Sequence, residues 1–454
     1  MKKLTRPSGF VKYVYFPLTQ RLKGQRVSDA LELLKKTQNY SPRQMRDLQW
    51  ERLMTMLEHA AKNVPYYRDR ISPKDVKSYE DFLKIPFLTK PDIRTHKEEL
   101  LNSDYKGHKW IARTSGSTGL AVEFFVDSNY CSFDWASRWR GRQWFDVSIG
   151  EPEVAMWGRP IYSKFARLWG GVKARLQNML LLCAFDLTEE KMGFYWEKIK
   201  RFQPAFFYGY STVLARLALF IKGKEGQAKN LSPKAIFATG ETLHQSSRKL
   251  LKSVFNCPVA IEYGCSEVGG FAFECPEGGL HISAENVFVE FLNEKNQPVK
   301  PGEIGEVVVT SLTNFYMPFI RYKIGDLGSP KDEICPCGRG LPLMELDTAK
   351  LEDVILTSKG KVFSSKLFDY INLALMAENI KGIRQFKVYQ KRADMFQVEV
   401  IKDIEFSDRA VEFFVKKMKE FISEDIEVNI KFVSHIPREK TGKLRYFVSE
   451  IGSK

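Results

Sequence analysis

Short apolar runs alternate with amphipathic segments through the middle of the chain, from residue 153 to residue 263. The apolar runs predict short buried strands at Glu153–Trp157, Leu180–Phe185, Ala205–Tyr208, Ala235–Thr239 and Val259–Tyr263. Helices are expected between several of them, near residues 188–202, 211–222 and 243–255. Alternating strands and helices are typical of βαβ units, so we expect a largely parallel sheet, with ligands beyond the carboxyl ends of its strands.

The apolar pattern changes on both sides of this region. Apolar side chains from Met45 to Ala61 recur at helical spacing after Ser41-Pro42, an N-cap followed by proline, which predicts a helix. A second helix is expected over Asp127–Asp146. Further on, residues alternate between apolar and polar over Asn286–Leu292 and Gly305–Leu312, with turn residues between them, which predicts a small antiparallel subdomain.

The last hundred residues have a third pattern. Short strands are expected near residues 354–357, 383–390, 396–401 and 427–432, with helices near residues 365–377 and 407–423. This is the pattern of a compact α+β domain. We therefore expect an α/β protein with a large N-terminal domain over residues 1–350, which begins with an arm at residues 1–40, and a small C-terminal domain over residues 351–454.

Composition narrows the class of protein. With 454 residues, 44% of them hydrophobic, the chain can bury substantial cores. The apolar run Met179–Phe185 is too short to cross a bilayer, and Lys12 interrupts the apolar stretch that a signal peptide would need. Seven cysteines, an odd number, argue against a disulfide framework. These features lead us to expect a cytoplasmic protein.

Basic residues outnumber acidic ones, 70 against 55, which gives a net charge of +15. Such a charge attracts nucleic acid, anionic membranes or anionic small molecules. The positive charge is spread along the chain and no nucleic-acid-binding motif accompanies it, so we expect no nucleic acid partner. In residues 2–26, basic side chains alternate with Phe10, Tyr13, Tyr15 and Phe16, which is compatible with a packed arm or with peripheral contact to a membrane interface.

A loop of small and hydroxylated residues precedes an apolar strand at Val122–Val126. Glycines permit positive φ and a close approach of the backbone to a ligand, and hydroxyl groups donate hydrogen bonds to phosphate oxygens. The alternative is an ordinary Ser/Gly-rich turn. The spacing is not that of a P-loop, and no lysine follows. The loop consists of Thr114, Ser115, Gly116, Ser117, Thr118 and Gly119.

Three more polar loops follow expected strands, at residues 208–211, 239–241 and 263–267.

A separate set of residues has the side chains of a tetrahedral structural zinc site, although its Cys-x-Cys spacing is tighter than usual. The alternative is a set of reduced cysteines in turns, with the histidine facing an active site. The set comprises Cys275, His281, Cys335 and Cys337.

Taken in order, these motifs resemble those of the acyl-adenylate-forming superfamily, especially the branch of phenylacetate–coenzyme A ligases and ligase-like proteins of capsule and polysaccharide gene clusters. The matching segments are T-S-G-S-T-G at 114–119, Y-G-C-S-E at 263–267, R-Y-K-I-G-D at 321–326 and P-R-E-K-T-G-K at 437–443. The resemblance extends from about residue 45 to residue 447. Structural zinc is also found in this branch, in stretches similar to the one that contains Cys275 and His281.

The resemblance implies roles for individual residues. The loop at 114–119 would hold the phosphates of ATP, and Glu267 would help to hold Mg²⁺, a hard cation that prefers oxygen ligands. Lys443, carried by a mobile C-terminal domain that rotates about a hinge near Glu352-Asp353, would offset charge in the adenylation transition state. The other nucleotide-binding residues would be Gly240, Glu241, Tyr263, Gly264, Ser266, Asp326 and Lys350, and the acyl pocket would include Tyr208, Gly209 and Tyr210.

The expected function is that of a carboxylate–coenzyme A ligase. A carboxylic acid and Mg-ATP would give an acyl-adenylate and pyrophosphate, and coenzyme A would then displace AMP; a role in polysaccharide biosynthesis is part of the same expectation. Two alternatives stay open: transfer of the acyl or adenylyl group to another acceptor, and a catalytically silent scaffold for polysaccharide assembly.

Overall fold

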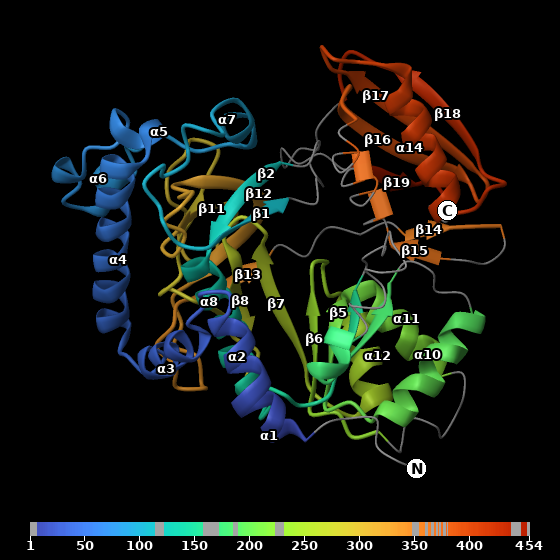
Figure 1. The fold of residues 1–454 in the computed structure, drawn as a ribbon, viewed down its shortest axis with the longest axis horizontal. Helices are drawn as coiled ribbons and strands as arrows, with labels where there is room; N and C mark the ends of the chain where they lie inside the picture. Colours follow the sequence, from blue (N-terminus) through green and yellow to red (C-terminus); the bar gives the residue numbers. More distant parts are fainter. Residues whose placement is uncertain are drawn as a thin grey trace.

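A mixed sheet of eleven strands forms the centre of the large domain, in the order β10-β11-β12-β13-β9-β8-β7-β6-β5-β3-β4 (Figure 1). The computed structural model describes residues 7–113, 122–157, 172–184, 189–222, 231–346, 354–358, 362–364, 367–368, 371, 374–375, 378, 380–436 and 446–451. The strands of the sheet are β3 Glu153–Trp157, β4 Met179–Cys183, β5 Phe206–Tyr210, β6 Ala235–Thr239, β7 Val259–Cys265, β8 Gly269–Glu274, β9 Leu280–Ile282, β10 Val287–Leu292, β11 Gly305–Ser311, β12 Tyr322–Lys331 and β13 Leu343–Leu346.

The strands from β3 to β7 are parallel, as the βαβ pattern predicted. Helices α10 Glu189–Phe202, α11 Ser211–Lys222 and α12 Gln245–Phe255 cover one face of this half of the sheet. Helices α3 Val27–Thr37 and α8 Ser128–Gln143 cover the other. Side chains alternate between the two layers: Phe207 and Ile236 pack under α10–α12, whereas Phe206 and Phe237 pack against α3 and α8. Because both faces are covered, the strands are mostly apolar.

The antiparallel strands expected near residues 286–312 are present as β10 and β11, which pair from Val287 with Ser311 to Leu292 with Glu306. They belong to the same sheet as the parallel strands. The antiparallel and parallel halves join where β8 pairs antiparallel with β7, with a register shift between Tyr263 and Gly264. A side chain at position 264 would place its Cβ 2.2 Å from the carbonyl oxygen of Gly269, so the close approach of these two strands requires glycine.

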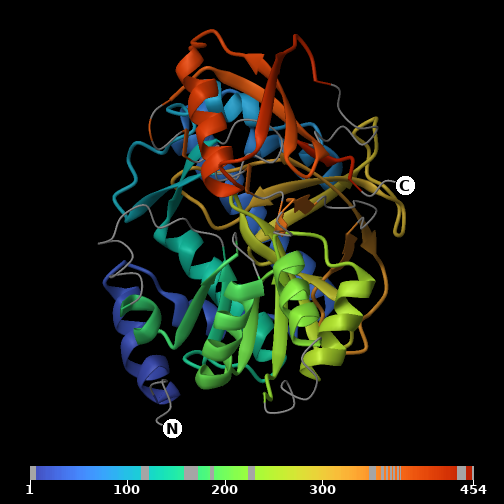
Figure 2. The ribbon, with the colours of Figure 1, turned by 90° about the vertical axis from the view of Figure 1, so that its right-hand side faces the viewer.

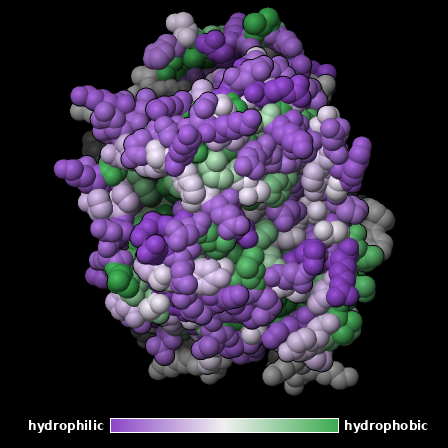
Figure 3. All heavy atoms as spheres, turned by 90° about the vertical axis from the view of Figure 1, so that its left-hand side faces the viewer, coloured by the Kyte–Doolittle hydropathy of each residue, from purple (hydrophilic) through white to green (hydrophobic). Residues whose placement is uncertain are grey.

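The helix predicted from Met45 to Ala61 is α4 Pro42–Asn63, and its Ser41 and Gln44 form a reciprocal capping box. It packs on the antiparallel half of the sheet through residues such as Leu53 and Leu57. The surface that carries α4 is largely hydrophilic (Figure 3). Around it lie α5 Pro65–Arg68, η2 Pro73–Asp75, α6 Tyr79–Phe82, α7 Lys90–Thr95 and the hairpin of β1 Lys109–Arg113 with β2 Glu123–Asp127.

The N-terminal arm is packed against the large domain. Helices α1 Ser8–Phe10, η1 Val11–Tyr15 (a π turn) and α2 Phe16–Arg21 follow one another without a break, and α3 comes after a turn at Gly24. Figure 2 shows these blue helices beside the teal helix α8, and Phe16 meets Trp139 of α8 edge-on, with ring centroids 6.3 Å apart. Within the described part of the chain, no helix is both long enough and apolar enough to span a membrane.

The C-terminal residues form a separate four-stranded sheet, in the order β18-β17-β16-β19, with its own apolar core. Described residues within the predicted helix at 365–377 are helical and buried at Leu367, Phe368, Ile371, Ala374 and Leu375. The domain boundary expected at residues 350–351 lies outside the described residues. The elements are β14 Val354–Leu356, β15 Val362–Ser364, β16 Ile383–Arg392, β17 Met395–Lys402, α14 Asp408–Phe421, β18 Glu427–Phe432 and β19 Phe447–Ser449.

Candidate functional site

The carboxyl ends of the parallel strands gather the polar loops that the sequence indicated. Tyr210 at the end of β5 pairs with Thr239 at the end of β6, and Thr239 pairs with Glu262 of β7. The loops that follow β5, β6 and β7 are therefore neighbours at one edge of the sheet. This edge is where ligands bind in open parallel sheets.

An aromatic stack lies where β3 and β5 end. The ring of Trp157 lies parallel to that of Tyr208, 5.6 Å away, and is also stacked on Tyr210, 4.5 Å away. Gly209 between the tyrosines has no room for a side chain, because a Cβ there would lie 2.5 Å from the carbonyl oxygen of Met156. Trp157 was not predicted as a site residue, although its place at the end of a predicted strand was a usable signal.

Buried charges hold this stack from the side of α8. Arg138 donates a hydrogen bond of 2.7 Å to the Tyr208 hydroxyl and forms an ion pair with Asp134, one helical turn away. Arg142 contacts Glu262 at 3.0 Å. Burial raises the pKa of the neighbouring Glu153, and the Arg142 guanidinium opposes that rise. The arrangement fixes Tyr208 in place. The two arginines were not predicted from the sequence either, because Tyr208 and Glu262, which they contact, lie on other elements.

Gly240 and Glu241 form the turn after β6. Gly240 has a φ of +72°, which explains the glycine. The Glu241 carboxylate accepts hydrogen bonds from the backbone N–H of Thr212 at 2.9 Å and from its hydroxyl at 2.6 Å. Glu241 therefore caps the start of α11, where a negative charge is favourable.

Tyr263 and Asp326 come from two separate motifs and meet at this edge. The Tyr263 hydroxyl donates a hydrogen bond of 2.9 Å to the Asp326 carboxylate. Gly325, with a φ of +77°, lies beside Asp326 where the pairing of β12 with β11 shifts register. The Tyr263 ring is also fixed by an edge-on contact with Phe271, with centroids 5.0 Å apart.

Glu267 is a buried carboxylate, whereas Ser266 beside it is exposed. The hydroxyl of Tyr322 donates a hydrogen bond of 2.6 Å to Glu267 Oε1. Burial raises the pKa of Tyr322 well above its ordinary value, and the Glu267 carboxylate adds to the rise, so this hydroxyl stays protonated and acts as the donor. The backbone carbonyl of Ser266 accepts a bond from Tyr130 at 2.7 Å. A buried, oriented carboxylate is a suitable ligand for a hard divalent cation.

Arg321, the first residue of the R-Y-K-I-G-D segment, has a structural role. Its guanidinium is buried and bonds to both carboxylate oxygens of Glu290, at 2.8 and 3.1 Å. It also donates to the carbonyl oxygens of Leu83 and Ile85. These contacts tie the start of β12 to β10 and to the segment before α7.

The remaining predicted site residues lie outside the described residues. The phosphate-loop segment is flanked by the hairpin pair Arg113 and Glu123, joined by an ion pair of 2.9 Å. The predicted site residues concerned are Thr114, Ser115, Gly116, Ser117, Thr118, Gly119, Lys350, Glu352, Asp353 and Lys443.

The three cysteines and the histidine predicted as zinc ligands do come together, with their ligand atoms all within 4.8 Å of one another. The Sγ atoms of Cys275 and Cys335 are 3.5 Å apart, and Cys337 Sγ lies 3.2 Å from His281 Nε2. Zn–S bonds of about 2.3 Å place two thiolates of a tetrahedron about 3.8 Å apart, so the cluster has the size that zinc requires.

The surroundings of the cluster also suit a metal. The Leu341 carbonyl lies 3.3 Å from His281 Nδ1, which leaves Nε2 directed at the cysteines. Burial lowers the pKa of His281 to about 4, so its imidazole is neutral at neutral pH and able to bind a cation. A Cβ at Gly279 would lie 2.7 Å from Cys335 Sγ, so glycine permits the cysteines to converge.

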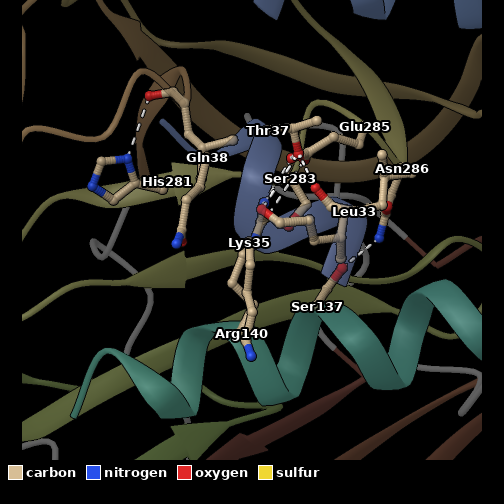
Figure 4. A network of polar contacts seen from close by, with 12 residues as sticks. Leu33, Lys35, Thr37, Gln38, Ser137, Arg140, His281, Ser283, Glu285 and Asn286 are labelled. Atoms are coloured by element: carbon tan, nitrogen blue, oxygen red, sulfur yellow. Dashed lines mark hydrogen bonds and ion pairs between the residues drawn. The ribbon is translucent and has the colours of Figure 1, made fainter. Parts of the chain in front are cut away.

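A buried polar network next to His281 joins the arm to the sheet (Figure 4). Glu285 accepts hydrogen bonds from Arg140 at 2.7 Å and from the Thr37 hydroxyl at 2.5 Å. Arg140 also donates to the carbonyl of Leu34 and to the hydroxyl of Ser283. Helix α3, helix α8 and the segment between β9 and β10 are thereby held in one arrangement.

Comparisons with known proteins agree with this fold. Residues 356–450 match the model of the CapK C-terminal domain family. The chain is 26% identical to Protein CapK of Staphylococcus aureus, with 89% of each chain covered. It is 23% identical to phenylacetate-coenzyme A ligase of Thermus thermophilus, over 88% of this chain and 95% of that one. The crystal structure of 2-hydroxyisobutyryl-CoA ligase in complex with 2-HIB-AMP and CoA superposes with a TM-score of 0.61 at 17% identity, over 91% of both chains. The chain thus has the fold of 2-hydroxyisobutyryl-CoA ligase, has CapK and phenylacetate-coenzyme A ligase as homologues, and matches the CapK C-terminal domain family over residues 356–450.

Proposed function

We propose that this protein is an AMP-forming acid–thiol ligase. In the first half-reaction the carboxylate of an acid attacks the α-phosphate of ATP and releases pyrophosphate. In the second, the thiol of coenzyme A attacks the acyl-adenylate and releases AMP. The observation that carries the proposal is the 2.9 Å hydrogen bond from Tyr263 to Asp326, because it brings together two segments for which the sequence resemblance implies a role in nucleotide binding.

The described residues supply specific functions in this reaction. Asp326, held by Tyr263, would accept hydrogen bonds from the ribose hydroxyls of ATP. Glu267, oriented by Tyr322, would hold Mg²⁺, which neutralises phosphate charge when bound. Roles for Lys443 and for the loop at 114–119 are supported by the sequence resemblance and by the similarity to phenylacetate–coenzyme A ligases.

The aromatic stack favours an acid with a flat or apolar body. Trp157 is stacked on Tyr208 and Tyr210 where β3 and β5 end, and Arg138 donates a hydrogen bond to the Tyr208 hydroxyl. Aromatic rings in a binding pocket favour apolar and aromatic ligands. We therefore propose an arylacetic or similar aromatic acid as the substrate class.

We also infer that Cys275, His281, Cys335 and Cys337 bind one structural zinc ion. Support comes from the spacing of the four ligand atoms and from the contact of His281 Nδ1 with the Leu341 carbonyl, which leaves Nε2 directed at the cysteines. Four protein ligands close a tetrahedral site, which is the arrangement of structural rather than catalytic zinc.

Pyrophosphate release, measured across aromatic, aliphatic and hydroxy acids with and without coenzyme A, tests the ligase activity. Acid-dependent release of pyrophosphate is expected, with AMP release that depends on the thiol.

Glu267→Gln should lose adenylation by orders of magnitude, because a neutral amide offsets less of the metal charge. Glu294→Gln, at an exposed turn, is the matched control and should behave as the wild type.

Different outcomes separate the alternatives. Pyrophosphate release without any effect of coenzyme A on AMP release would indicate a different acceptor. No exchange of pyrophosphate into ATP with any acid would indicate a catalytically silent scaffold. Near-normal exchange by Glu267→Gln would remove Glu267 from the metal site.

A further inference from the structure

The helices of the N-terminal arm have one face on the protein and one face outward. Val11, Phe16 and Gln20 are buried, and Phe16 packs against Trp139 of α8. A Cβ at Gly150 would lie 2.5 Å from the carbonyl oxygen of Ser8, so the arm lies tightly on the loop before β3. The arm is therefore a fixed part of the surface, and its outward face has a defined position.

Large apolar side chains occupy that outward face. Phe10, Val14, Leu18 and Leu22 recur every fourth residue and are 42%, 50%, 56% and 74% exposed. Tyr13 beside them is 72% exposed. The π turn at Val11–Tyr15 has more residues per turn than an α-helix, which helps residues at this spacing to stay on one side. We call these five residues the outer stripe.

The outer stripe differs from the rest of the exposed apolar surface. Among the other strongly exposed apolar side chains, Ile334 and Ile404 lie on separate loops, and Phe194 and Leu219 lie on separate helices. Single exposed apolar residues are normal in folded proteins, whereas a continuous apolar stripe marks an interaction surface.

Basic residues accompany the outer stripe along the sequence. The first 28 residues contain seven lysines and arginines and no aspartate or glutamate, and the first acidic residue is Asp29. Within the described residues, Lys12, Arg21 and Lys23 form no ion pair with a carboxylate. An apolar face bordered by unopposed basic side chains is the pattern of helices that lie in the interface of an anionic bilayer.

We propose that the outer stripe docks the protein onto a membrane surface that contains anionic phospholipids. The apolar side chains enter the boundary between headgroups and acyl chains, while the long basic side chains extend to the phosphates. A second copy of the chain fits this face less well. In a two-fold dimer the same patch meets itself, so the basic residues of the two copies would face one another without compensation.

Sedimentation of the full-length protein with vesicles tests the proposal. Binding is expected to vesicles of phosphatidylcholine mixed with phosphatidylglycerol, to be much weaker to phosphatidylcholine alone, and to fall as salt is added. The double variant Leu18→Ser/Leu22→Ser should bind at least tenfold less, and so should Arg21→Glu/Lys23→Glu. The matched control is Ile404→Ser, an exposed apolar residue of the C-terminal domain, which should bind as the wild type does.

All of these side chains are exposed, so thermal unfolding of the variants should match that of the wild type. Equal binding to neutral and anionic vesicles, or wild-type binding by the Leu18→Ser/Leu22→Ser variant, would overturn the proposal. A lipid-free dimer that Leu18→Ser/Leu22→Ser converts to a monomer would also overturn it, because the stripe would then be an interface between copies of the chain.

Discussion

Individual buried side chains hold the loops around the candidate site. Asp127 Oδ1 accepts from the N–H of Tyr130 at the start of α8, and its Oδ2 accepts from the N–H groups of Phe315 and Tyr316. The Arg321 guanidinium likewise holds the start of β12 through its ion pair with Glu290 of β10. Buried charges with satisfied partners fix one geometry, and removing a single partner leaves an uncompensated charge.

Glu290→Gln should therefore destabilise the protein strongly. The amide keeps the shape of the carboxylate but leaves the buried Arg321 guanidinium unneutralised, and the expected loss in unfolding free energy is about 3–5 kcal/mol. Urea denaturation measures it. Glu306→Gln on the neighbouring strand is the matched control: its partner Lys323 is partly exposed, and the expected loss is below about 1 kcal/mol. Equal losses in the two variants would contradict the role given to Arg321.

Tyr263→Phe tests the hydrogen bond between the two segments that we propose to bind the nucleotide. Without the hydroxyl, the charged carboxylate of Asp326 loses one hydrogen bond. The loss of such a bond corresponds to about a tenfold rise in the KM for ATP. The value of kcat should change less. Tyr389→Phe, which removes a hydroxyl bonded to Glu399 in the C-terminal sheet, should leave KM unaltered. An unchanged KM in Tyr263→Phe would show that Asp326 needs no positioning.

At the level of elements, local patterns predicted the parallel strands and the helices between them. Strands buried on both faces read as apolar runs, so β3 and β6 have the predicted bounds. The pairing of β13 with β9 was not predictable, because Leu343 and His281 are far apart in the sequence and no local signal selects the partner. The strand-end loops of the site were predicted, whereas Trp157 was not, because its role depends on tyrosines of another strand.

Two turns that are far apart in the sequence form the predicted zinc site. Protein purified with zinc supplied and without chelator should contain about one zinc ion per chain. Cys335→Ser should lose the metal and unfold at a lower temperature, because the metal joins the turn after β8 to the loop before β13. Cys131→Ser, distant from the cluster in the sequence, should keep its metal. Metal analysis that finds no zinc in the wild type would leave these residues as ordinary turn residues.

At the level of the whole molecule, the C-terminal residues have their own sheet and core. Cys183, at the end of β4, packs against that core from the large domain. A unit with a separate core can move relative to its neighbour without unfolding. This property suits the domain rotation that the sequence resemblance implies for the two half-reactions.

Lys443→Ala should therefore affect the two half-reactions differently. Formation of the acyl-adenylate, measured by ATP–pyrophosphate exchange, should be crippled, because the lysine charge offsets charge that develops in that transition state. Thioester formation from a synthetic acyl-adenylate should be largely intact. Equal loss in both steps would argue against alternation of the domain, and no loss in either would exclude a catalytic role.

The core of the antiparallel half also has a consequence for the order in which the nascent chain folds. It combines buried side chains from residues 53–130 with buried side chains from residues 268–344. The first group leaves the ribosome long before the second, a delay on the order of ten seconds or more at ordinary translation rates. The βαβ units from β3 to β7 pair strands that are near one another in the sequence and have no such delay. The middle of the chain is thus able to fold first, while the segment around α4 keeps apolar surface exposed until β12 has been synthesised.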